Sequence, residues 1–148
     1  MPLEANRSAP AFAERQVFVD AARERVWGLL SDIDDWPRWQ SSVSRARLEG
    51  PLTPGTAFRW KAGGMSITST LDRVTPPSHI AWRGKALGLR AIHAWHLYRH
   101  PDGTVVMTAE SFEGPLARLL RPLMQRTLNR GLEQGLADLK REAEAFGE

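Results

Sequence analysis

Apolar and polar residues alternate through the middle of this chain and recur at helical spacing toward its two ends. Between residues 43 and 112, apolar side chains take every second position in short runs separated by turn residues. In one run Phe58 and Trp60 share a face, with cationic side chains on the other. A period of two is typical of strands with one buried face. Strands are therefore expected over 14–21, 43–49, 56–62, 65–74 and 79–84, with two more within 91–114.

Helical spacing dominates the remaining segments. Residues 22–33 place apolar side chains three and four positions apart after Asp20, a suitable N-terminal cap, and Pro37 interrupts the pattern. From Pro115 to Phe146 one apolar stripe continues, and Pro122 either bends its first turns or marks its true start. The stripe consists of Leu116, Leu119, Leu120, Leu123, Met124, Leu128, Leu132, Leu136 and Leu139. Two short helices and one long C-terminal helix are predicted.

The connections between strands indicate how these elements pack. Short hairpin links imply an antiparallel sheet, and its apolar face needs a cover that only the last helix is long enough to supply. Gly131 and Gly135 lie near the apolar stripe of that helix. Each costs about 1 kcal/mol against alanine, so they indicate either open space beside the helix or a tolerated weak point. The segment 83–90, with two glycines, reads as a loose, mobile connection.

Composition narrows the class of protein. The 148 residues suit a single domain over 14–146, after a flexible arm of residues 1–13 that is rich in alanine and proline. The absence of cysteine excludes disulfides and fits a cytoplasmic location. No signal peptide, no membrane span and no clustered basic stripe for nucleic acid is recognised. Whether the chain forms a homodimer stays open.

The chain contains six tryptophans and one tyrosine, a ratio that favours a hydrophobic interior or a hydrophobic pocket. Trp36 and Trp39 are expected to pack the short helices against the end of the sheet, where they could also line an entrance.

The turn HPDG (100–103) sets a register between the last two strands. If Arg99 and Thr104 flank this turn, then His93 faces Glu110 across the strands, and one face collects the apolar residues. The two side chains would then be neighbours on the inner face, and Trp82 of the preceding strand would lie near His93. Burial would raise the pKa of Glu110, whereas a protonated His93 would lower it.

A helix through the same stretch is the alternative. It would bring His93, His96 and His100 to one face, like a metal site. Gly88 and the turn leave little room for such a helix, and the aromatic content favours a strand. No metal and no other cofactor is therefore expected.

Four stretches resemble one known family. They are VFVDAARERVWGLLSDIDDWPRW, FRWKAGGMSITSTLDRVTPPSHIAWRG, HAWHLYRHPDGTVVMTAESFEG and LNRGLEQGLADLKREAE. Over residues 14–144 the chain is similar to the SRPBCC superfamily, the START-like, helix-grip group that includes polyketide cyclase/dehydrase-like proteins. The resemblance implies an α+β fold in which a seven-stranded antiparallel sheet wraps around the C-terminal helix and encloses a hydrophobic cavity. The implied cavity residues are Phe58, Trp60, Ile67, Ser69, Trp82, His93, Trp95, Thr108, Glu110, Leu128 and Leu132.

Three functions are compatible with this pattern. The first is binding of a small hydrophobic or aromatic molecule in the cavity. The second is a cyclase or dehydratase in which His93 and Glu110 transfer protons; the alternative for this pair is that the two side chains satisfy each other or bind a ligand hydroxyl without chemistry. The third is a protein-interaction module on the outer face of the sheet, where Tyr98, Val105 and Met107 are expected.

Overall fold

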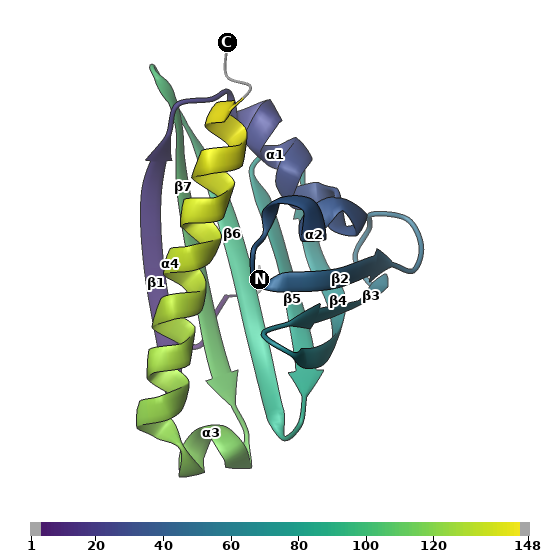
Figure 1. The fold of residues 1–148 in the computed structure, drawn as a ribbon, viewed down its shortest axis with the longest axis vertical. Helices are drawn as coiled ribbons and strands as arrows, with labels where there is room; N and C mark the ends of the chain where they lie inside the picture. Colours follow the sequence, from purple (N-terminus) through teal and green to yellow (C-terminus); the bar gives the residue numbers. More distant parts are fainter. Residues whose placement is uncertain (1–3, 146–148) are drawn as a thin grey trace.

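The computed structural model describes residues 4–145 and shows an antiparallel sheet curled around a long helix (Figure 1). The strands are β1 (Ala11–Val19), β2 (Val43–Leu48), β3 (Ala57–Ala62), β4 (Met65–Thr75), β5 (His79–Ala86), β6 (Leu89–His100) and β7 (Gly103–Glu113). The helices are α1 (Arg23–Ser31), the 3-10 helix η1 (Ile33–Asp35), α2 (Trp36–Trp39), α3 (Pro115–Leu119) and α4 (Arg121–Ala145). The expected α+β helix-grip fold is confirmed.

The sheet order, β1-β7-β6-β5-β4-β3-β2, follows from the hairpin links. Consecutive strands from β2 to β7 are neighbours, and β1 joins the far edge beside β7. The α1–α2 segment therefore carries the chain from one edge of the sheet to the other. Figure 1 shows α4 crossing the concave face near β1 and β7, with α1 and α2 at one end and α3 at the opposite end.

Trp36 closes the end of the sheet next to α2, as expected. It is only 1% exposed, and its ring lies 5.3–5.5 Å from the rings of Phe58, Trp60 and Trp82. Its indole N–H donates to the carbonyl oxygen of Leu30 at 3.1 Å. Both the apolar surface and the single polar atom of this side chain are thus satisfied in the core.

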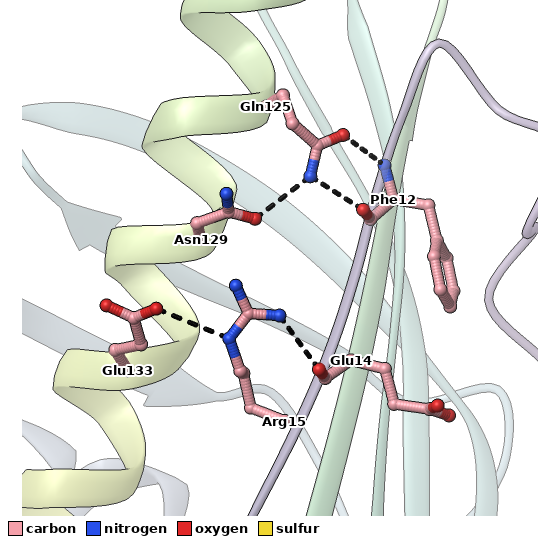
Figure 2. Close-up of polar contacts among 6 residues, drawn as sticks. All are labelled: Phe12, Glu14, Arg15, Gln125, Asn129 and Glu133. Carbon is pink, nitrogen blue, oxygen red and sulfur yellow. Dashed lines mark hydrogen bonds and ion pairs between the residues drawn. The ribbon is translucent and has the colours of Figure 1, made fainter.

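Side chains of α4 also cover the free edge of β1 (Figure 2). The side-chain oxygen of Gln125 accepts from the backbone N–H of Phe12, and its NH₂ group donates to the Phe12 carbonyl at 2.7 Å. Farther along, the guanidinium of Arg15 donates to Glu133 at 3.3 Å. An edge strand exposes unpaired backbone groups, so these contacts protect it as well as fix the helix.

The N-terminal segment differs from expectation at two points. Residues 11–13, expected in a loose arm, belong to β1, and both Ala11 and Ala13 are buried. Small side chains fit beneath α4 there, so the alanine-rich composition reflects close packing. Residues 1–3 lie outside the described part of the chain. Asp20 does not cap α1, because the cap residue is Ala22 and the Asp20 amide instead donates to Glu144.

The segment 83–90 is a tight hairpin, and the expectation of a loose connection was wrong. Strand β5 continues to Ala86 and β6 starts at Leu89, which leaves a two-residue turn. Leu87 and Gly88 have φ angles of +36° and +77°. Positive φ at both central residues is the geometry that joins twisted antiparallel strands most tightly, and glycine allows it without strain.

The apolar stripe of the C-terminal segment is broken at Leu120. This residue separates α3 from α4 with φ −116° and ψ 42°, and Pro122 lies in the first turn of α4. The alternative in which Pro122 marks the helix start is therefore confirmed. Leu119 and Leu123 are 78% and 49% exposed, because the break turns this part of the stripe away from the core. Phe146 lies outside the described residues.

Candidate functional site

A pocket of about 290 Å³ lies between the concave face of the sheet and α4. This volume is close to the lower end of the range, about 300–1,000 Å³, that is usual for small-molecule sites. Alternation along β3 to β7 directs every second side chain into it, and α4 supplies the opposite wall. Its wall includes nine of the expected residues, Trp60, Ile67, Ser69, Trp82, His93, Trp95, Glu110, Leu128 and Leu132.

Two expected residues, Phe58 and Thr108, are not on the pocket wall. Phe58 is fully buried and packs edge-on against Trp36 and Trp82, each with ring centroids 5.5 Å away. Thr108 is also fully buried, beneath the imidazole of His93. Both lie one layer behind the wall and hold its side chains in place.

Of the two helix glycines, Gly131 faces open space and Gly135 leaves room for the ring of Trp95. Both Gly131 and Gly135 line the pocket, and a Cβ atom built on Gly131 would meet nothing within 4 Å. A Cβ on Gly135 would lie 3.8 Å from the ring of Trp95, at ordinary contact distance. The absence of side chains at these positions therefore widens the pocket, in line with the open-space alternative.

Sequence reasoning missed a large part of the pocket wall, both beside α2 and at the β5–β6 turn. The additional wall residues are Gln40, Ser42, Ala62, Gly63, Met65, Gly84, Lys85, Ala86, Leu89, Ala91, Phe112, Met124 and Thr127. A signal for some of them was present. Ala91 pairs with Phe112 in the same register that pairs His93 with Glu110, so extending that register by two residues finds both.

His93 and Glu110 occupy facing positions on β6 and β7, as the turn predicted. The Nδ1 atom of His93 lies 3.6 Å from Oε1 of Glu110, too far for a direct hydrogen bond. Trp82 pairs with His93 across β5 and β6, and the two ring centroids are 5.0 Å apart. The imidazole therefore lies among indole rings, as expected.

Burial determines the charge of this pair. It lowers the pKa of His93 to about 3 and raises the pKa of Glu110 to about 8. Removing a group from water disfavours its charged form, and no compensating interaction is strong enough here to reverse that effect. At neutral pH both side chains are therefore uncharged, and their proximity does not make an ion pair.

Hydrogen bonding to Thr108 assigns the proton on the imidazole. His93 Nε2 lies 2.8 Å from the Thr108 hydroxyl, which donates its own hydrogen to the carbonyl of Ala94 at 3.2 Å. A hydroxyl has one hydrogen, and with that hydrogen on the Ala94 carbonyl we assign Thr108 as the acceptor from His93 and place the imidazole proton on Nε2. Nδ1 is then a bare acceptor, and it has no hydrogen-bond partner among the described residues. The protonated Glu110 beside it is a donor.

The comparisons with known proteins identify the family. A family model described as "Polyketide cyclase / dehydrase and lipid transport" matches residues 11–144. The chain belongs to this family. The expected SRPBCC-type, START-like membership is thereby confirmed. No protein of curated function matches the chain significantly.

Solved structures share the fold at low sequence identity. A hypothetical protein from Helicobacter pylori is 20% identical with a TM-score of 0.80, and the match covers 93% of this chain and 90% of that one. The Zhui aromatase/cyclase from Streptomyces sp. R1128 is 19% identical with a TM-score of 0.79, covering 93% and 98%. A START superfamily protein from Mycobacterium smegmatis is 16% identical with a TM-score of 0.76, covering 90% and 97%. At such identities the likeness shows the fold alone.

Residues 93–100 lie in β6, so the helical alternative for this stretch was wrong. His93 and His96 lie on one strand and face opposite sides of the sheet, and His96 stacks on His79 with ring centroids 4.0 Å apart. Within residues 4–145 no group of three or more potential metal ligands comes together. Nor does this part of the chain contain a helix long and apolar enough to cross a membrane.

Proposed function

We propose that this chain binds a small hydrophobic or aromatic molecule in the pocket between the sheet and α4. The observation that carries the proposal is a mostly apolar and aromatic wall in which two buried, uncharged side chains, Glu110 and His93, place a donor beside an acceptor. Pockets for small molecules combine a mostly apolar surface with a few placed polar groups that fix orientation.

The polar pair also defines what kind of ligand fits. A group that accepts from the Glu110 carboxyl and donates to His93 Nδ1 would satisfy both, as a phenol or alcohol hydroxyl can. The flat rings of Trp60, Trp82 and Trp95 favour an aromatic body. The preferred ligand class is therefore an uncharged aromatic or polycyclic compound with one hydroxyl group.

Tryptophan fluorescence tests this proposal directly, since three indoles line the pocket. Titration with a panel of naphthols and larger hydroxylated aromatics should give a saturable change. Gly131→Leu should abolish that change by filling the pocket, whereas Gly28→Leu adds the same side chain to the exposed side of α1 and should leave it intact. Non-saturable changes, or equal losses in both variants, would contradict binding in this pocket.

A second candidate is a dehydratase or cyclase, favoured by the facing donor and acceptor. In a dehydration of a β-hydroxy ketone, His93 Nδ1 would take the proton from the carbon beside the carbonyl. Glu110 would protonate the departing hydroxyl, which leaves as water when the C–O bond breaks. A proton then returns from the imidazolium to the carboxylate, whose facing atoms lie 3.6 Å apart.

If the chain is an enzyme, a change at Glu110 should affect turnover much more than ligand binding. With an aryl β-hydroxy ketone as probe, Glu110→Gln should lower the rate of enone formation by about 100-fold or more. The same variant should change the affinity for a naphthol only modestly. Absence of enone formation by the unaltered protein would leave binding as the function.

A further inference from the structure

We propose that the end of the molecule at α3 is a docking surface for an anionic lipid bilayer. Four leucines define this leucine patch: Leu87, Leu119, Leu120 and Leu123, with exposed fractions of 81%, 78%, 36% and 49%. Isolated exposed leucines are common on soluble proteins, but a group of them at one end of a molecule marks an interaction site.

The turn that carries Leu87 contacts the start of α3, the helix that carries Leu119; Leu120 follows α3 directly, and Leu123 lies in the first turn of α4. A Cβ atom on Gly88 would lie 3.7 Å from Cβ of Leu116, and one on Gly114 would lie 2.7 Å from the Gly88 carbonyl oxygen. Figure 1 shows the β5–β6 turn and α3 at the same end, opposite α1 and α2. The four leucines therefore belong to one tip and not to separate surfaces.

Cationic side chains flank the leucines along the sequence. The run 114–131 contains four exposed arginines and no acidic residue, and the hairpin segment 85–90 adds exposed Lys85 and Arg90. Glu113, the acid at the end of β7, is half-buried and faces Arg90 across β6 and β7. Apolar residues flanked by cations are the composition that inserts at a headgroup boundary and attracts anionic lipids.

The same charges argue against a second copy of the chain as the occupant. A two-fold symmetric contact would place this cationic surface against itself. An acidic protein fits the charge, but leucine is uncommon among the residues that dominate protein interfaces, and the tip adds no aromatic anchor or groove. Projecting leucines on a two-residue turn and around the break between α3 and α4 suit a fluid apolar layer better.

Docking at this tip would place the pocket against the bilayer. Ala86 and Leu89 flank the turn that carries Leu87, and Met124 follows Leu123; all three line the pocket. A bound molecule could thus pass between membrane and pocket without crossing water. This consequence rests on the proposed function, whereas the docking itself does not.

Vesicle co-sedimentation tests the docking. The protein should sediment with vesicles of phosphatidylcholine and phosphatidylglycerol but only weakly with phosphatidylcholine alone, and added salt should weaken the binding. Leu119→Ser with Leu123→Ser should lower the partition coefficient by about tenfold or more, because each leucine loses its apolar contact. Phe18→Ser with Tyr98→Ser removes exposed apolar side chains elsewhere on the sheet and should leave partitioning unchanged.

A second pair of variants separates the charge from the leucines. Arg118→Ser with Arg121→Ser should weaken binding to the anionic vesicles, whereas Arg45→Ser with Arg47→Ser, on exposed positions of β2, should not. All the substituted side chains lie at the surface, and thermal unfolding checks that the variants fold.

Three outcomes would overturn the docking proposal: no sedimentation of the unaltered protein, equal losses in patch and control variants, or binding to polyglutamate without binding to vesicles. Sedimentation equilibrium adds a fourth, a dimer that the leucine substitutions dissociate. None of these outcomes affects the fluorescence titration with naphthols, so failure of docking is distinguishable from failure of ligand binding.

Discussion

Replacing Glu110 with glutamine should remove the loss of folding stability that the unaltered protein shows as the pH rises. The folded protein raises the pKa of this carboxyl from 4.5 to about 8 through burial. Between these values the folded chain keeps a proton that the unfolded chain has released. Stability therefore falls as pH rises through this window, and glutamine, which cannot ionise, should not show the fall.

His93 acts in the opposite direction at lower pH. Its pKa falls from 6.5 in the unfolded chain to about 3 in the folded one, so stability falls as pH drops through that window. Where the two windows overlap, between 4.5 and 6.5, the two slopes cancel. The pair alone therefore predicts a plateau there, with a decline on either side.

The size of the effect follows from one proton. Each pH unit within the window of Glu110 costs about 1.4 kcal/mol, so the rise from about pH 5 to pH 8 costs about 4 kcal/mol. The Glu110 side chain keeps 17% exposure and borders the pocket, so water screens part of this cost. An advantage of about 2–4 kcal/mol is therefore expected for Glu110→Gln at about pH 8, and almost none at about pH 5.

Urea unfolding of both proteins at several pH values measures the difference. Contributions from other titrating groups, such as His79, cancel when the two curves are subtracted. Ser69→Ala, a pocket residue that does not titrate, is the control and should shift stability equally at every pH. Parallel curves for the unaltered protein and Glu110→Gln would refute the assignment of an uncharged pair.

Three further predictions concern the supports of the site. Gly131→Ala should stabilise the protein by about 1 kcal/mol, as Gly28→Ala should on α1, because neither new methyl group meets a neighbour; thermal unfolding measures both. Gln125→Ala should cost about 1–2 kcal/mol and speed hydrogen exchange at the Phe12 amide, which it leaves at an open strand edge. Asp138 accepts from Ser41, Gln134 and Arg141, and although burial alone would raise its pKa, these bonds lower it. Asp138→Asn should therefore cost about 2 kcal/mol near neutral pH and less in acid, where the carboxylate of the unaltered protein is itself protonated; urea unfolding checks this.

The sheet and its register were predictable because two local signals agree. The HPDG turn sets which residues of β6 and β7 face each other, and the alternation of apolar residues independently sets which face is buried. A shift of the strand pairing by one residue would have exposed all of these apolar side chains, so the agreement of the two signals supports this register. This is why the facing positions of His93 and Glu110 could be read from the sequence.

The sequence was less informative about which apolar residues line the pocket. Phe58 and Trp60 share one face of β3, yet only Trp60 reaches the pocket wall, because Trp36 from α2 packs over Phe58. Likewise Leu123 continues the spacing of the buried stripe, but the break at Leu120 changes its direction. Periodicity shows which face of a strand or helix a residue lies on. It does not show whether a second element packs over that face and separates the residue from the pocket.

The charge of the His93–Glu110 pair depends in part on Thr108, a residue that does not reach the pocket. Sequence reasoning left two opposed effects on Glu110, burial that raises its pKa and a protonated His93 that would lower it. Thr108 helps to keep His93 neutral. Its hydroxyl donates to Ala94 and accepts from Nε2–H of His93, and the neutral imidazole already makes this hydrogen bond. A second proton on Nδ1 would gain only Glu110 as a partner while charging a buried ring. The pair therefore stays uncharged, and this is the reason for proposing an uncharged hydroxylated ligand beside it.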